Sequence, residues 1–292
     1  MALIGIDLGT TNSLGVVYRE GRAELIPNRF GSFLTPSVVS VDENGAVITG
    51  AVAKERLITH PERTVASFKK FMGTKETWDL GGRKFTAEEL SSFVERYLGE
   101  KVDEAVISVP AYFHDRQRTA TKKAGALAGV QVNRIINEPS AAALASYFDT
   151  DQEQLFLVFD FGGGTLDVSI VDCFDTMVEI VSVSGDNRLG GDNFHDIMAE
   201  SFLREHPEAR EHITERERAV LRRAAEKCKQ ELTRKNEAVM RAAVGGADYE
   251  SIYTNRRLME ESGEILERIR KVLTHALTDG GFGVQDIAAV VM

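Results

Sequence analysis

Short apolar runs and helical patterns alternate along the chain in an order that occurs twice. Three apolar, β-branched runs joined by glycine-containing turns open the sequence and predict a three-stranded meander, at residues 3–7, 13–19 and 23–28. The apolar spacing then becomes helical from Asp115, a predicted N-cap, and stops at Gly129. Strands are predicted on both sides of this helix, which makes a strand, helix, strand unit, at residues 104–113 and 130–139.

The same order restarts in the second half of the chain. A second meander is predicted at residues 155–162, 166–174 and 177–186. Helices are predicted to follow at residues 193–206, 214–235 and 257–278, with a capping box of Thr214 and Glu217 and with Gly280 just beyond the last helix. The sequence ends in an apolar strand, "DIAAVVM", and a strand at the last residue suggests a truncated product.

The restart is an internal repeat. "IGIDLGTTNS" at residues 4–13 and "LVFDFGGGTLD" at residues 157–167 share an apolar strand, an Asp, a Gly turn and a Thr. We therefore expect an α/β protein with two related lobes, residues 1–150 and 151–292, and a site in the cleft between them. A length of 292 residues also favours two lobes over one.

Composition and charge limit the kinds of partner and the cellular location that we expect for this protein. The net charge of −10 comes without a long basic block, so a nucleic acid partner is not expected. No signal peptide and no run of about 20 apolar residues is present, so we predict a cytoplasmic protein without a membrane partner. Cys173 and Cys228 are predicted to be buried, reduced thiols.

The two repeated turns carry the candidate chemistry. Glycine lets several backbone N–H groups point into one concavity, which can bind phosphate oxygens. Asp7 and Asp160 end the two strands, where carboxylates can hold the hydrated Mg²⁺ of a nucleotide, and Thr10, Thr11 and Thr165 add hydroxyl donors. A tight turn with an incidental Asp would explain either copy by itself, but the pair favours a phosphate site.

Two other phosphate motifs are excluded. The chain has no G-x-x-x-x-G-K-[ST], and the turn at residues 162–164 leads into a strand pattern rather than the helix of a dinucleotide fingerprint.

At these motifs the chain resembles the nucleotide-binding domain of the 70-kilodalton heat-shock chaperone family, DnaK-like and nearest to its HscC-type branch. The matching segments are "IGIDLGTTNS", "TPSVVSV", "FKKFMG", "AVISVPAYF", "RIINEPSAAALA", "LVFDFGGGTLDVSIVD" and "GDNRLGGDNF". The resemblance implies the actin-like ATPase fold, with duplicated ribonuclease H-like domains. It also implies hydrolysis of ATP to ADP with Mg²⁺, and K⁺ as an optional second ion.

The resemblance implies roles only for matching positions. The implied catalytic residues are Lys69, Glu138, Asp167 and Thr165, and the implied metal residues are Asp7 and Asp160. By themselves, a Lys in a Lys-Lys pair is usually a surface charge and a Glu before Pro is usually a helix N-terminal residue. The implied nucleotide-contacting residues are Gly9, Thr10, Thr11, Asn12, Gly162, Gly163, Gly164, Gly190, Gly191, Glu226, Lys229, Gln230 and Thr233.

Some positions depart from the family pattern or have an ordinary structural explanation. Gln230 stands where most relatives have an Arg that stacks on the base, so weaker adenine binding is expected. Glu226 and Lys229 would otherwise form an ordinary helical ion pair, and Gly190 and Gly191 would simply precede a helix. Pro110 and Arg118 resemble residues that relay the nucleotide state to a peptide-binding domain, which this sequence lacks.

The resemblance also sets the expected partners. A longer parent would bind unfolded polypeptide clients and a J-domain co-chaperone. The region at residues 236–253 is shorter than in most relatives, so the resemblance does not imply that a nucleotide-exchange factor is a partner. Two alternatives stay open at this point: a non-catalytic nucleotide-sensing module, and another phosphotransferase of the same fold, such as a sugar kinase.

Overall fold

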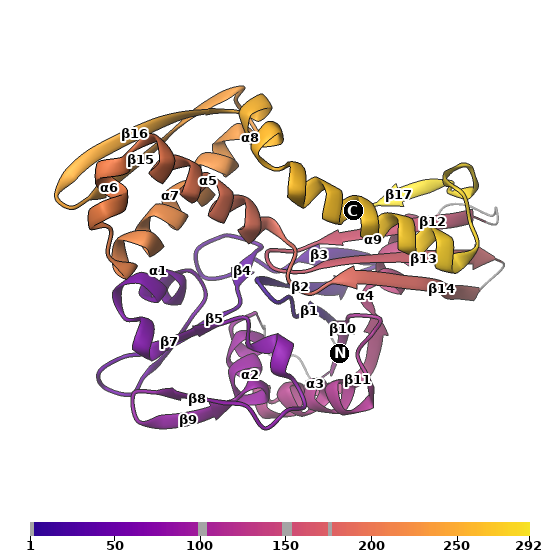
Figure 1. Cartoon of the computed structure of the whole chain (residues 1–292). Coiled ribbons are helices and arrows are strands. Elements are labelled where there is room, and N and C mark those ends of the chain that lie inside the picture. The colour runs from indigo at the N-terminus through magenta and orange to yellow at the C-terminus, as the bar shows by residue number, and fades with distance from the viewer. Residues whose placement is uncertain (1–2, 99–103, 148–153, 175–176) are drawn as a thin grey trace. The chain divides into compact units, whose positions relative to one another are not determined.

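The computed structural model describes residues 3–98, 104–147, 154–174 and 177–292 (Figure 1). It is a mixed α/β structure, which confirms the predicted fold class. The chain forms two compact units. The first comprises Met1–Gly162, Asp167–Val183 and Ala276–Met292, and the second comprises Gly163–Leu166 and Ser184–His275. The predicted lobe boundary at residues 150 and 151 lies outside the described residues, and the division into those two lobes stays a prediction.

The largest sheet of the first unit has the strand order β11-β10-β1-β2-β3, with β4 also paired to β2. The predicted meander is confirmed, although β3 ends at Leu25 instead of residue 28. The Asn28 side chain accepts hydrogen bonds from the N–H groups of Phe30 and Ser32, so a turn replaces the end of the strand. The strands are β1 Leu3–Asp7, β2 Asn12–Arg19, β3 Arg22–Leu25, β4 Thr35–Pro36, β10 Glu104–Val109 and β11 Gln131–Asn137.

A second sheet in the same unit repeats this arrangement, with the strand order β14-β13-β12-β17. In each sheet the first strand of the meander also pairs in parallel with a later strand, β1 with β10 and β12 with β17. This common topology confirms that the sequence repeat is a structural one. The strands are β12 Gln154–Phe161, β13 Leu166–Phe174, β14 Met177–Asp186 and β17 Ala289–Val291, of which Leu166 and the end of β14, from Ser184, belong to the second unit.

Helices pack against both sheets of this unit. One face of β1 and β10 is fully buried in the main core, together with Leu90 and Val94 of α2. Ala143 of α4 packs with Phe156 and Val158 of the second sheet. The helices of this unit are α1 Ala51–Thr59, η1 Pro61–Arg63, η2 Phe68–Phe71, α2 Ala87–Leu98, α3 Asp115–Ala128, α4 Glu138–Tyr147 and η3 Val284–Asp286.

The predicted start of α3 is wrong by one residue, and its end is confirmed. His114 is the N-cap, with extended backbone, and its N–H donates to the side chain of Gln117 at 3.2 Å. Asp115 is instead the first helical residue, where its charge favours the helix dipole. Gly129 has a φ of 87°, the left-handed conformation that favours glycine after a helix.

Two small sheets complete the first unit. One has the order β6-β5-β7, and the other is the β8–β9 hairpin. Their strands are β5 Val38–Val41, β6 Val47–Thr49, β7 Thr64–Ala66, β8 Thr77–Leu80 and β9 Arg83–Thr86.

The second unit has its own core between helices and one hairpin. Phe202 of α5, Leu221 of α7 and Tyr253 of β16 belong to the same buried cluster. The capping box is confirmed, because the N–H of Glu217 donates to Thr214 and the N–H of Thr214 donates back to the Glu217 carboxylate. The elements are α5 Gly191–Glu205, α6 Pro207–His212, α7 Glu215–Leu232, β15 Glu237–Val244, β16 Ala247–Thr254, α8 Asn255–Glu261 and α9 Gly263–Gly280, of which the last residues, from Ala276, belong to the first unit.

The long helix predicted at residues 257–278 is wrong as a single element. It is broken at Ser262 into α8 and α9, and Gly280 is the last residue of α9 rather than the residue beyond it. Thr254 caps α8 by accepting from the N–H of Arg257, and apolar spacing continues through the break, so periodicity did not reveal it. Cys173 and Cys228 are free and buried, as predicted.

One buried group of the first unit should make stability depend on pH. Glu95 of α2 is 1% exposed, and both carboxylate oxygens lack a hydrogen-bond partner in the part of the chain that the structure describes. Burial raises the pKa of Glu95 from 4.5 to about 8. The folded protein therefore holds a proton here that the unfolded chain releases at lower pH.

We expect the stability contributed by protonated Glu95 to be complete below pH 4.5 and lost as the pH rises to about 8. Glu95→Leu removes this titration and should raise the free energy of unfolding at pH 9 by at least about 2 kcal/mol. Urea denaturation of both proteins from pH 5 to pH 9 measures the difference. Parallel stability curves for the two proteins would contradict the assignment.

Candidate functional site

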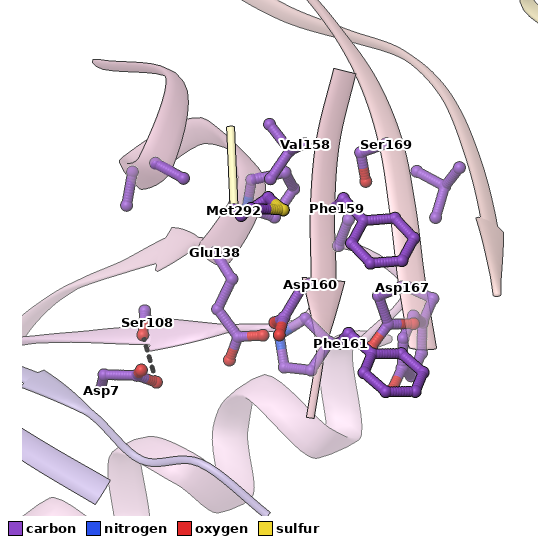
Figure 2. A pocket seen from close by; sticks show the side chains of 17 residues that line it. Asp7, Ser108, Glu138, Val158, Phe159, Asp160, Phe161, Asp167, Ser169 and Met292 are labelled. Carbon is purple, nitrogen blue, oxygen red and sulfur yellow. Dashed lines mark hydrogen bonds between the residues drawn. The ribbon is translucent and has the colours of Figure 1, made fainter. Parts of the chain in front are cut away.

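The first unit contains a cavity of about 610 Å³ that both halves of the repeat line. Asp7, Ser108 and Glu138 come from the first half, and Asp160 and Asp167 come from the second. Figure 2 shows the carboxylates of Glu138 and Asp160 turned toward one another, with Asp167 nearby and Asp7 beside Ser108. The two predicted metal residues therefore share one cavity.

The pairing of β1 with β10 places Asp7. The parallel register sets Asp7 opposite Ser108, and the Ser108 hydroxyl donates to Asp7 Oδ1 at 3.2 Å. Because parallel strands end at the same edge of a sheet, both side chains lie where a ligand can approach. Sequence analysis missed Ser108, and only the register of β10 against β1 could have identified it.

Lys69 is a buried cation bonded to one of the residues that line the cavity. It lies in η2, is 5% exposed, and its Nζ donates to Glu138 Oε1 at 2.9 Å. The Nζ also lies 5.7 Å from the centre of the Phe113 ring. The neighbouring Lys70 is exposed, so of the two lysines it is Lys69 that pairs with the acidic residue. Lys69 is therefore not the surface charge that its local sequence favours, whereas Glu138 is the first residue of α4, as its local sequence favours, and also the partner of Lys69.

The backbone before Lys69 is unusual. Ser67, the residue before η2, has a φ of 58°, which non-glycine residues seldom adopt. Such a conformation persists only where surrounding contacts hold it, and it turns the chain so that Lys69 points inward while Lys70 does not.

The electrostatics of the cavity favour a bound cation. Burial, followed by the charge of Asp7, raises the pKa of Asp160, although the residue is exposed at the cavity. Burial and the charges of Asp160 and Glu138 raise the pKa of Asp167 to about 7. Burial also raises the pKa of Glu138 despite the opposing effect of Lys69. Neighbouring carboxylates disfavour one another's ionisation, and a divalent cation would relieve this repulsion.

Oxygen ligands are those that Mg²⁺ prefers, so the Asp7 and Asp160 carboxylates fit that ion. Magnesium is commonly held by one or two carboxylates, with water and phosphate oxygens as its other ligands. Among the described residues there is no group of three or more His, Cys, Asp or Glu side chains suited to holding a metal without such help.

The first predicted phosphate turn, Gly9–Asn12, is tight. A Cβ atom at Gly9 would lie 2.0 Å from the carbonyl oxygen of Asn12, so only glycine fits without a backbone shift. Thr10 and Thr11 are partly buried and Asn12 is exposed. The residues thus form a compact backbone turn beside Asp7, as a phosphate-binding turn requires.

The second predicted phosphate turn follows Gly162 and, from Gly163 to Thr165, belongs to the second unit. The start of α5 packs directly on it. The N–H of Asp192 donates to the carbonyl oxygen of Gly163 at 2.7 Å. A Cβ atom at Gly190 would lie 2.5 Å from backbone atoms of Gly163 and Gly164, so this position also needs glycine.

The remaining predicted nucleotide residues lie on α7 and at its end, in the second unit. The Glu226 carboxylate accepts a hydrogen bond from Arg223 Nη1 at 2.6 Å, and Lys229 Nζ donates to the carbonyl oxygen of Gly191 at 2.9 Å. Lys229 therefore ties α7 to the start of α5. Gln230 is exposed, and Thr233 is the C-cap residue.

Pro110 and Arg118, which resemble relay residues of the family, both lie in the first unit. Pro110 lines the cavity. Arg118 is not a simple solvated charge, because it donates to the carbonyl oxygen of Phe113 at 2.9 Å and to the Asn137 side chain at 2.7 Å. It thereby connects the loop after β10 to the residue before Glu138.

The structure thus brings Asp7, Glu138, Asp160 and Asp167 together in one cavity, with Lys69 bonded to Glu138. Within the second unit it brings Gly163, Gly164 and Gly190 together.

None of the helices in the described part of the chain has the length and the apolar composition needed to cross a membrane.

Comparison with known families agrees with this geometry. A family model described as Hsp70 protein matches residues 3–80 and 80–292, which is nearly the whole chain. The mixed α/β structure with its repeated sheet topology is consistent with the actin-like ATPase fold. The chain is thus an Hsp70-type nucleotide-binding domain and belongs to the Hsp70 protein family.

Proposed function

We propose that this chain binds ATP and hydrolyses it to ADP in a Mg²⁺-dependent reaction, as the ATPase domain of an Hsp70-type chaperone. The observation that carries the proposal is the buried Lys69–Glu138 pair next to a cavity lined by Asp7, Asp160 and Asp167. Phosphoryl transfer depends mainly on positioning and charge stabilisation, and this arrangement offers one fixed cation among several carboxylates.

Each side chain has a distinct task in the proposed reaction. Asp7 and Asp160 would hold hydrated Mg²⁺, which neutralises phosphate charge when it is bound. Lys69 Nζ would contact the γ-phosphate and orient the attacking water, and Glu138 keeps that Nζ in place. Asp167, whose pKa is raised to about 7 in the metal-free protein by burial and by the neighbouring carboxylates, would accept the proton from the attacking water.

The glycine turns would supply the phosphate contacts. Backbone N–H groups of the Gly9–Asn12 and Gly162–Gly164 turns can approach phosphate oxygens closely because no side chain blocks them. Thr165 would add a hydroxyl donor. Ribose contacts by Glu226 and Lys229, and base contacts by Gln230 and Thr233, complete the proposal, as do Gly190 and Gly191 beside the second turn.

Finer assignments rest on the same resemblance. We place the chain in the DnaK-like, HscC-type branch, with lobes at residues 1–150 and 151–292 around the nucleotide. In a longer parent, ATP turnover would drive binding of unfolded clients and would be stimulated by a J-domain co-chaperone. K⁺ as a second ion and a cytoplasmic location remain predictions.

Phosphate release from ATP tests the proposal. We expect release with Mg²⁺ that stops on addition of EDTA. Transfer of the phosphate to an added sugar instead of water would establish a kinase. If the parent, Thr165→Val and Lys69→Ala proteins all bind ATP tightly and none of them releases phosphate, the chain is a nucleotide sensor.

Replacement of Gln230 tests the base contact. We expect Gln230→Arg to tighten ADP binding by about 0.5–2 kcal/mol, because a guanidinium plane can stack on adenine and an amide carries no charge. Isothermal titration calorimetry measures the change. Gln230→Lys adds the same charge without a guanidinium plane, so it is the control for charge alone. Unchanged affinity in Gln230→Arg would contradict base stacking at this position.

A further inference from the structure

Two buried serines lie behind the first phosphate turn. Ser13 is 1% exposed and Ser37 is 2% exposed. Ser13 belongs to β2, and Ser37 directly follows β4, which pairs with β2 through Asn12 opposite Pro36. Strand pairing therefore brings the Thr-Pro-Ser segment against the Gly9–Asn12 turn, a segment to which the proposed reaction assigns no role.

Ser37 makes two hydrogen bonds to the backbone of the turn. Its hydroxyl donates to the carbonyl oxygen of Gly9 at 2.7 Å, and its N–H donates to the carbonyl oxygen of Thr11 at 2.8 Å. The hydroxyl groups of Ser13 and Ser37 are 2.8 Å apart. Because the Ser37 proton is directed at Gly9, Ser13 donates to Ser37 Oγ, and the two hydroxyls form a chain in which each bond strengthens the other.

These bonds fix the direction of the turn's amides. In a trans peptide the C=O of one residue and the N–H of the next point in opposite directions. The carbonyl groups of Gly9 and Thr11 point toward Ser37, so the N–H groups of Thr10 and Asn12 point away from it. Two amides on one side of a tight turn form a concavity suited to a phosphate oxygen.

We propose that Ser37, supported by Ser13, is a positioning residue that holds the Thr10 and Asn12 amides toward the nucleotide phosphate. The inference rests on the proposed nucleotide-binding function, and it assigns the Thr-Pro-Ser segment a role in that site. Ser37 acts through the backbone and does not itself touch the nucleotide. Its effect should therefore appear as lost order in the turn and as lost affinity together.

The test combines hydrogen exchange of the nucleotide-free protein with calorimetric titration of MgADP. We expect Ser37→Ala to speed amide exchange in residues 9–12 and to weaken MgADP binding about tenfold, since one buried hydrogen bond to the turn is lost. Ser13→Ala keeps both Ser37 bonds to the turn and should weaken binding about threefold.

Ser40→Ala is the matched control. Ser40 is also buried, at 0% exposed, and it bonds to Thr64 and Arg56 rather than to the turn. We expect it to leave exchange in residues 9–12 and the affinity for MgADP unchanged. If Ser37→Ala does not fold, Ser13→Ala is compared with Ser40→Ala. Weaker MgADP binding and faster exchange in Ser13→Ala alone would support the proposal, and equal values in the two variants would overturn it.

The outcomes separate the two claims. MgADP affinity and exchange that are the same in Ser37→Ala and Ser40→Ala would overturn the positioning role and leave the nucleotide function standing. A second outcome is faster amide exchange in Ser37→Ala while none of the proteins, including the parent, binds MgADP. This outcome would support the ordering of the turn by Ser37 and would overturn the proposed nucleotide function.

Discussion

Lys69→Met should lower the rate of ATP hydrolysis by about 10²–10³ while changing ATP affinity much less. Lys69 Nζ donates a hydrogen bond to Glu138, and its charge lowers the pKa values of Asp160 and Asp167 against the effect of burial. Its removal leaves charge that develops on the transferred phosphoryl group without that fixed partner. Single-turnover phosphate release and equilibrium ATP binding, measured on the same protein, separate the two effects.

Lys70→Met is the matched control, because it removes the same charge from the adjacent, exposed position. We expect it to hydrolyse ATP within about twofold of the parent, since an exposed charge contributes little. Methionine keeps most of the Lys69 side-chain volume, so the fold should persist. Equal rates for Lys69→Met and Lys70→Met would contradict the catalytic assignment of Lys69.

Gly190→Ala should disrupt the second phosphate turn. The added Cβ would lie 2.5 Å from Gly163 and Gly164 backbone atoms, which cannot move as freely as a side chain. We expect the free energy of unfolding to fall by about 1–3 kcal/mol. We also expect nucleotide binding to weaken by more than about tenfold, because a displaced turn can no longer aim its amides. Chemical denaturation and MgADP titration measure the two effects.

Gly263→Ala is the control within the same unit. A Cβ at Gly263 would meet nothing within 4 Å, and the position begins α9. Alanine favours a helix over glycine, so stability should stay equal or rise by less than about 1 kcal/mol. A Gly190→Ala protein as stable as Gly263→Ala, with full affinity, would show that the turn has room the structure does not indicate.

The sequence was sufficient for the features that depend on local chemistry or on repetition. Both meanders, the Thr214 capping box and the left-handed Gly129 follow from residue types at short spacing, and the structure has each of them. The repeat also predicted that Asp7 and Asp160 would share one site, and both line the same cavity.

Features that depend on tertiary packing were not predictable. The break at Ser262 interrupts a continuous helical pattern, and His114 rather than Asp115 caps α3. Burial of Lys69 beside Glu138 depends on a contact 69 residues apart in sequence. Ser108 joins the cavity through strand register alone, which no short motif encodes.

The hydrogen bond from Ser182 to Ala276 has a consequence for how the chain assembles. The Ser182 hydroxyl donates to the carbonyl oxygen of Ala276 at 2.6 Å, across 94 residues of sequence. These two residues flank the long segment Ser184–His275, which thus enters and leaves the first unit at neighbouring points. Closure entropy grows only slowly with loop length, so the length of this segment can vary at little entropic cost as long as Gly190 and Asp192 keep their contacts with Gly163.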